Sequence, residues 1–347
     1  MAVKERPQLV PSFYLRNFAV DEEKAHVALY NQETRKFLHQ AAILDQDADP
    51  GLYALDGTAE AAYGQFVHSA PRLFAAPTTK IIPPNYGEDL NLFKKYVLFQ
   101  LLRSHKSAMQ WMDAAGERIL TQWPAFRKPG RAPAPGTDEY SASASLLHAL
   151  RYLPQMNYLA IKSFVNLTPL SFFTSDNPVV VCNQWTTQRG QGMGATAIGA
   201  MGLQLFIPIH PRLMYCLYDP GTYEFREKEY PFVKIESQES VEQLNILHYL
   251  SSRTHLYFDE SIQKGYIHSL VQAYGAQKNS KNPVFPVEAY GVNGNSDSFL
   301  LHPFSAPHFP LDLPFLKTKE GVRTAAINSD FTAHRHPSWS AMAGRAY

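Results

Sequence analysis

The residues of this sequence best suited to chemistry form a compact polar turn between two apolar runs. Ser175, Asp176 and Asn177 are followed by Pro178 and by the valines of residues 179–181. Asp and Asn side chains bond their own backbone in tight turns, proline fixes φ, and consecutive valines predict a buried strand. A loop beside a strand that carries hydroxyl, carboxylate and amide groups is a good place to hold a ligand. The same residues make a stable turn unaided, which is the structural alternative.

A second set of reactive side chains lies on a helix that the sequence predicts over residues 237–251. Glu242, Asn245 and His248 follow one another at three-residue steps, so they share one side of the helix approximately. An acid, an amide and an imidazole together could serve hydrolysis, with His248 as the base. The alternative is a polar face that flanks the leucines of the core.

Arg103 is the third candidate, because it directly follows the apolar residues 96–102 in the strongest predicted helix, over about 89–123. A guanidinium held beside a packed helix face can clamp a carboxylate or a phosphate. The alternative is a structural arginine that caps a carboxylate of the protein itself.

The elements that must position these groups follow from the spacing of apolar residues. Two β-like runs, 26–30 and 36–39, flank a polar turn and predict a hairpin. Pro208 and Pro211 indicate that at least one later strand lies at a sheet edge or ends early. The remaining patterns predict helices over 57–76 and 261–274 and strands over 158–165, 179–182, 203–209, 213–218 and 254–258.

These elements predict an α+β protein in which a helical N-terminal half packs on a mainly antiparallel sheet, with an extended C-terminal arm. We expect a single domain over residues 1–278. It comprises a hairpin and helical part (1–123), a linker rich in proline and basic residues (124–139) and a sheet-rich part (140–278). The arm covers residues 279–347.

The predicted arm is rich in Pro, Gly, Asn and aromatic residues and lacks sustained periodicity. We expect its aromatic side chains to be buried against folded protein, at Phe299, Phe304, Phe309, Phe315 and Trp339. Contact with the chain's own core is the more economical arrangement. Contact with a neighbouring subunit would instead make the chain a homo-oligomer.

The composition excludes several classes of protein. With 347 residues, 45% of them hydrophobic and 18% charged, the chain is typical of a globular protein. A formal net charge of +1 gives no global field that recruits nucleic acid or a membrane surface. No apolar run is long enough to span a bilayer, and no apolar signal segment follows the basic N-terminus. Cys182 and Cys216 lie in apolar runs and are expected to be buried, reduced thiols of a cytoplasmic protein.

Known catalytic signatures give no further assignment. The chain has no phosphate-binding loop with a Walker lysine, no HExxH helix, no nucleophile elbow and no paired cysteines at zinc spacing. The sequence therefore assigns no metal-ligand set and identifies no cofactor.

Several motifs resemble, in the same order, those of a mostly bacterial family of uncharacterised proteins, the domain of unknown function 4238. They are FYLRNF (residues 13–18), the helix end at 102–104, TSDNP (174–178), the strand at 206–211 and Leu244-Asn245 followed by Ser252-Arg253. The resemblance extends from about residue 7 to residue 260 and leaves the arm uncovered. TSDNP is its most specific motif. The resemblance to the family implies a fold but no reaction.

The chain departs from this family at two places. Pro7 and Gln8 occupy the positions of a His-His pair that family members typically have. Ile209-His210-Pro211 replaces the Leu-Ser-Pro of many members. If that pair bound a metal or moved protons, this chain has lost the function or moved it elsewhere.

The resemblance and the candidate residues together predict one polar centre. Its proposed catalytic residues are Ser175, Asp176, Asn177, Asn245 and His248, and its proposed substrate-binding residues are Tyr14, Arg16 and Arg103. In one hypothesis the chain is a hydrolase or nuclease-like enzyme for a phosphate-containing substrate, with arginines on the phosphate and Asp176 orienting water or one divalent cation. In the other it is a non-catalytic recognition or assembly protein, and the cluster is a structural hydrogen-bond network. A concave cluster favours the first hypothesis, and the missing His-His pair favours the second.

Overall fold

The computed structural model describes most of the predicted domain and part of the arm. The described residues are 10–46, 68–74, 87–103, 153–187, 196, 198–278, 288–291, 297–300, 307, 309–320 and 322. The predicted linker 124–139 lies outside them, as do most of the predicted helix 57–76 and the part of the longest helix beyond residue 103.

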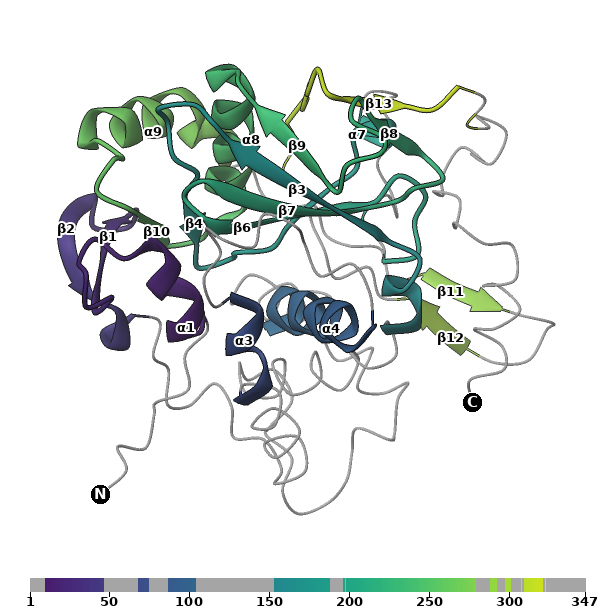
Figure 1. Cartoon of the computed structure of the whole chain (residues 1–347), viewed down its shortest axis with the longest axis horizontal. Helices are drawn as coiled ribbons and strands as arrows, with labels where there is room; N and C mark the ends of the chain where they lie inside the picture. The colour runs from purple at the N-terminus through teal and green to yellow at the C-terminus, as the bar shows by residue number, and fades with distance from the viewer. Residues whose placement is uncertain are drawn as a thin grey trace, which may run out of the picture.

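Two sheets form the centre of the molecule (Figure 1). The larger has five strands in the order β5 (Val180–Cys182), β6 (Gln204–His210), β7 (Leu213–Tyr218), β3 (Ala160–Asn166) and β9 (Phe232–Ile235). Only the β3–β9 pair is parallel. The smaller has four antiparallel strands in the order β2 (Lys36–Ala42), β1 (His26–Asn31), β10 (His255–Phe258) and β4 (Thr174–Ser175). The predicted α+β fold with mainly antiparallel pairing is confirmed.

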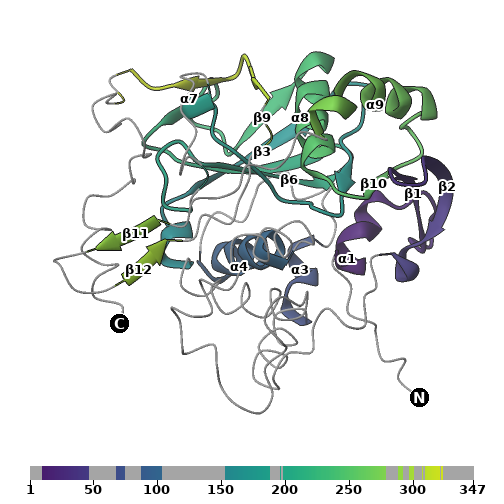
Figure 2. The same ribbon diagram turned by 180° about the vertical axis from the view of Figure 1, so that it is seen from behind.

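Helices cover both faces of the five-stranded sheet (Figures 1 and 2). One face carries α4 (Gly87–Arg103), and the other carries α8 (Gln238–Ser251), with α9 (Lys264–Lys278) packed against α8. The shorter helices are α1 (Ser12–Leu15), η1 (Arg16–Phe18), η2 (Ile43–Asp45), α3 (Pro71–Phe74) and α7 (Gln184–Thr187). Pro71 is the first residue of α3, where its missing N–H costs nothing.

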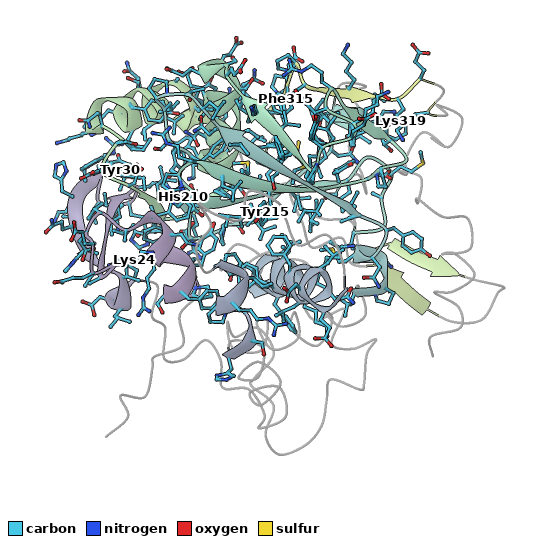
Figure 3. All side chains as sticks on the ribbon, in the orientation of Figure 1. Lys24, Tyr30, His210, Tyr215, Phe315 and Lys319 are labelled. Carbon is cyan, nitrogen blue, oxygen red and sulfur yellow. The ribbon has the colours of Figure 1, made fainter. Side chains whose placement is uncertain are left out.

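Strand alternation divides the apolar residues between these two faces. Leu205 and Ile207 of β6 belong to the cluster that packs on α4, whereas Phe206 between them belongs to the cluster on the α8 side. The ring of Tyr215 on β7 lies 5.3 Å from that of Phe93 on α4. Tyr215 and Phe315 accordingly lie on opposite sides of the sheet in Figure 3.

Pro208 shows how β6 tolerates a proline in a sheet. The pairing of β6 with β5 ends at Phe206, so Pro208 lies beyond the shorter strand. The pairing with β7 shifts register between Pro208 and His210. The prediction of an edge or an early end is therefore confirmed in the form of a local edge and a bulge.

Residues 309–318 of the C-terminal arm pack on the chain's own core. Phe315 is buried, its ring lies 5.2 Å from that of Phe164, and Phe309 is partly buried. A short strand, β13 (Leu316–Thr318), pairs with β8 (Tyr223–Phe225), and a hairpin of β11 (Glu288–Gly291) and β12 (Asp297–Leu300) precedes it. The side chain of Phe299, and the whole of Phe304 and Trp339, lie outside the described residues.

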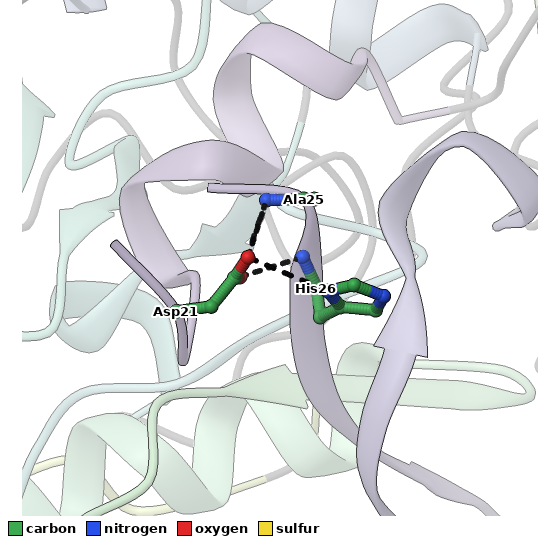
Figure 4. A network of polar contacts seen from close by, with 3 residues as sticks. All are labelled: Asp21, Ala25 and His26. Atoms are coloured by element: carbon green, nitrogen blue, oxygen red, sulfur yellow. Dashed lines mark hydrogen bonds and ion pairs between the residues drawn. The ribbon is translucent and has the colours of Figure 1, made fainter. Parts of the chain in front are cut away.

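An aspartate stabilises the turn that leads into β1. The carboxylate of Asp21 accepts hydrogen bonds from the N–H groups of Ala25, at 3.1 and 3.2 Å, and of His26, at 2.8 Å (Figure 4). Slight desolvation opposes them, but these hydrogen bonds keep the pKa of Asp21 below its usual value. Lys24 in this turn has a positive φ of 55°.

Candidate functional site

The TSDNP turn is the point where the chain passes from one sheet to the other. Thr174 and Ser175 form β4 at the edge of the four-stranded sheet, and Val180 begins β5 of the five-stranded sheet. The turn between them packs against the end of α8. The prediction that Asp176 and Asn177 lie on a loop between strands is confirmed.

The carboxylate of Asp176 bonds to three consecutive main-chain N–H groups. Its Oδ1 accepts from Arg253 at 2.8 Å, and its Oδ2 accepts from Thr254 at 2.5 Å and from His255 at 3.0 Å. The N–H of Asp176 also donates to the carbonyl of His255 at 3.1 Å. Asp176 is 5% exposed. One side chain thus fixes the turn that joins α8 to β10.

Ser175 and Asn177 complete the same junction. The Oγ of Ser175 accepts from the N–H of Asn177 at 3.1 Å and donates to its carbonyl at 3.0 Å. The Nδ2 of Asn177 donates to the carbonyl of Ser251 at 3.2 Å and to its Oγ at 2.7 Å. The Oδ1 of Asn177 is buried and has no hydrogen-bond partner among the residues that the structure describes. The turn is therefore attached to the last residue of α8.

Asn245 connects α8 to the segment that precedes the turn. Its Oδ1 accepts from the N–H of Phe173 at 3.2 Å, and its Nδ2 donates to the carbonyl of Ser171 at 2.9 Å and to the hydroxyl of Tyr266 at 3.3 Å. Asn245 is fully buried. Its amide therefore contacts the main chain of residues 171–173 much as a neighbouring strand would.

His248 occupies the buried side of α8, apart from Glu242. The side chain of Glu242 accepts a hydrogen bond from Gln238 at the exposed surface. His248 is fully buried, and within the described part of the chain neither ring nitrogen has a hydrogen-bond partner. Burial lowers its pKa to about 3. The expected acid, amide and base thus do not form one face, and His248 has no exposed atom that could reach a substrate.

Tyr14 connects the N-terminal motif FYLRNF to the junction. Its hydroxyl is 2.8 Å from the Oγ1 of Thr174 and donates to the carbonyl of Pro208 at 2.5 Å. The ring is fully buried against Phe74 and Tyr96, and this burial raises the pKa of the hydroxyl. Two motifs far apart in the sequence meet here, through a tyrosine that the sequence had suggested as a substrate-binding residue.

The two arginines of the predicted centre lie differently. Arg16 is exposed, and no hydrogen bond or ion pair joins it to Asp176 among the described residues. The side chain of Arg103, at the last residue of α4, lies outside the described part of the chain. A shared site of Asp176 and Arg103 stays a prediction.

We call this set of contacts the sheet junction: Tyr14, Thr174, Ser175, Asp176, Asn177, Asn245, Ser251 and the main chain of 253–255. The sequence could not identify the hydrogen-bond partners of Asp176, because they are main-chain N–H groups, which every residue except proline has. No group of three or more His, Cys, Asp or Glu residues that could hold a metal occurs in the described part of the chain.

Two other expectations concern the thiols and the membrane. Cys182 and Cys216 are buried and free, and burial raises the pKa of both, that of Cys182 to about 12. The predicted burial of both thiols is confirmed, and their reduced state stays a prediction. None of the helices described here is long and apolar enough to cross a bilayer.

Comparison with known proteins adds one result. The family model described as "Protein of unknown function (DUF4238)" matches residues 9–261. No curated protein and no solved structure matches the chain. The match includes the whole sheet junction and ends before α9 and the arm.

Proposed function

For a chain that belongs over residues 9–261 to the DUF4238 family of proteins of unknown function, we propose a non-catalytic role in recognition or assembly. The observation that supports it is the environment of Asp176, whose two carboxylate oxygens accept three main-chain N–H groups. In this proposal the sheet junction is a structural network, and surfaces elsewhere make the functional contacts.

The chemistry of these groups favours this role. A carboxylate that orients water or a divalent cation needs oxygen lone pairs directed at the ligand. At Asp176, three main-chain N–H groups of the α8–β10 turn already bond to the two oxygens, and the side chain is buried. A general base needs access to its substrate and a pKa near the working pH, and buried His248, with its pKa of about 3, has neither.

The competing proposal is a hydrolase or nuclease-like enzyme for a phosphate-containing substrate. Arg16 and Arg103 would hold the phosphate, and Asp176 would exchange its main-chain partners for water or a cation. The exposed guanidinium of Arg16 is compatible with anion binding. This mechanism requires water or a cation to reach a carboxylate that is 5% exposed and bonded to the α8–β10 turn.

Thermal unfolding of the full chain distinguishes the two proposals. We compare the parent with Asp176→Asn, each alone, with inorganic phosphate, and with phosphate plus Mg²⁺. A structural carboxylate predicts a lower melting temperature for the variant and no phosphate-dependent shift in either protein. If phosphate stabilises the parent, while the variant melts like the parent and loses that response, the enzyme proposal holds instead. The exposed Asp45→Asn is the matched control.

A further inference from the structure

Residues 309–318, which we call the strap, cover an apolar surface of the family domain. In Figures 1 and 2 the strap crosses the side of the five-stranded sheet opposite α4. Its buried side chains join the cluster formed by that sheet face, α8 and β8. The family match ends at residue 261, so the surface belongs to the family domain and the strap does not.

The strap lies on this surface as an extended peptide lies in a groove. Leu311, Leu313 and Phe315 are buried, whereas Pro310 and Asp312 are exposed, and so is the residue before Phe315. This alternation is that of a strand with one face bound. Recognition of an extended peptide typically combines such side-chain sites with hydrogen bonds to the peptide main chain.

The family domain also makes such hydrogen bonds to the main chain of the strap. The Nε2 of Gln184 donates to the carbonyl of Leu311 at 2.8 Å, and the Oε1 of Gln243 accepts from the N–H of Asp312 at 2.7 Å. Further along, the N–H of Arg226 donates to the carbonyl of Phe315 at 2.9 Å. Glutamine side chains that bind a peptide backbone do not depend on the peptide's own side chains.

A second glutamine fixes Gln184 in this orientation. The Nε2 of Gln204 donates to the Oε1 of Gln184 at 2.7 Å, and the N–H of Gln184 donates to the Oε1 of Gln204 at 3.1 Å. Both side chains are buried. This contact with Gln204 directs the Nε2 of Gln184 at the carbonyl of Leu311 in the strap.

Charge complements the end of the groove. The carboxylate of Glu224 on β8 bonds to Lys228, and this hydrogen bond, together with the charges of Lys228, Lys319 and Lys317, keeps its pKa below the usual value. The Nζ of Lys319 also donates to the carbonyl of Pro220 at 2.7 Å. Figure 3 shows Lys319 and Phe315 on the same side of the sheet. Lys317 and Lys319 of the chain's C-terminal arm therefore lie near an acidic side chain of the family domain.

We propose that this groove is a peptide-recognition site, filled in cis by the strap and filled in trans by the strap of a second copy of the chain. The strap makes the contacts with the groove described above. Residues 279–308 separate it from α9, which leaves a long connection for exchange between copies. This inference rests on the proposed recognition or assembly role and names its partner.

A cysteine pair tests the exchange on the full chain. Glu224 and Lys317 are paired residues of antiparallel β8 and β13, and facing residues of such strands have the Cα separation that a disulfide needs. The double variant Glu224→Cys/Lys317→Cys should oxidise within one chain and so verify the register in cis. The native Cys182 and Cys216 are buried and do not interfere.

A mixture of the two single variants, incubated at increasing concentration, shows whether the strap of one chain binds to another chain. We expect a disulfide-linked dimer on non-reducing gels, about tenfold above either single variant alone, when the protein concentration approaches the effective concentration of the tethered strap. A synthetic peptide of residues 307–320 should suppress it. The same peptide with Leu313→Asp and Phe315→Asp should not.

The opposite results are equally clear. If the double variant closes within one chain and the mixture gives no dimer at any concentration, the strap is a fixed part of the monomer and the inference is wrong. The inference is also wrong if the double variant forms no disulfide within one chain and the mixture of the two single variants forms no dimer. Neither result touches the proposed role of the sheet junction, which the Asp176 variants test separately.

Discussion

Asp176 illustrates how one side chain can accept hydrogen bonds from the main-chain N–H groups of a turn. Its carboxylate and the N–H groups that it accepts are 77 to 79 residues apart in the sequence. Asp21 does the same for the start of β1, where its partners are only four and five residues away (Figure 4). The two aspartates thus order the residues that open two neighbouring strands of one sheet.

Replacing Asp176 with alanine is expected to lower the free energy of unfolding by about 1–3 kcal/mol, because buried N–H groups lose their acceptor. Urea unfolding of variant and parent measures this change. Asp45→Ala, at an exposed position, is the control and should have little effect. An Asp176→Ala variant as stable as the parent would show that the carboxylate is free for another role.

His248 should make the protein sensitive to acid. Its pKa in the folded protein is about 3, below the ordinary value of 6.5. Between these values the unfolded chain binds the proton more readily, so stability from this group is complete above pH 6.5 and falls with pH by about 1.4 kcal/mol per unit. His248→Leu should remove that part of the slope in urea titrations between pH 6 and 4.

The control for this titration is His39→Leu, which removes an exposed imidazole. Other groups, such as Asp21, also lose stabilising contacts in acid, so the difference between variant and parent is the informative quantity. If the His248→Leu variant has the same slope as the parent, the pKa of His248 is not lowered in the folded protein, and its imidazole can bind a proton there.

At the level of elements, the hydroxyl of Tyr14 joins helix α1 by hydrogen bonds to strands β4 and β6. Tyr14→Phe removes the hydrogen bonds to Thr174 and Pro208 while keeping the buried ring, so we expect a loss of about 1–3 kcal/mol. Thermal unfolding checks this prediction. Tyr230→Phe, on an exposed tyrosine, is the matched control, and an equal effect of both variants would contradict the role of the hydroxyl.

Local signals explain which elements the sequence could predict. Helix α8 begins one residue after the expected cap, and the Oγ of Ser237 accepts from the N–H of Ser240 at 3.4 Å. Helix α9 begins at Lys264, three residues later than expected, because Asp259 bonds to Ser261 in the preceding turn. The strands β8, β9 and β13 have three or four residues each and form through distant pairing, which short sequence windows do not contain.

The sequence predicted where the candidate site lies but not which groups its side chains bond to. The polar turn could be predicted from the sequence, since turn residues are a local feature, and its link to FYLRNF was suggested by the family resemblance. The partners of Asp176 and the depth of His248 depend on how the two sheets and α8 pack. Arg16 had been expected at this centre, and the tyrosine two positions before it makes the contact instead.

At the level of the whole molecule, the strap contributes to the core of a domain that ends elsewhere in the sequence. Phe315→Ala is expected to cost about 3–5 kcal/mol, as for other large buried rings. Urea unfolding should still show one cooperative transition, shifted to lower denaturant. Lys317→Ala on the exposed side of the strap is the control, and a mild effect at Phe315 would mean that the strap is loosely held.

The position of the strap also has a consequence for synthesis on the ribosome. The sheet face and α8 have been translated by residue 261, but Phe315 and Leu316 follow more than 50 residues later. At ordinary elongation rates this interval is on the order of 3–11 s. During it the nascent chain exposes an apolar surface, and a neighbouring nascent chain on the same messenger can present the first strap that fits.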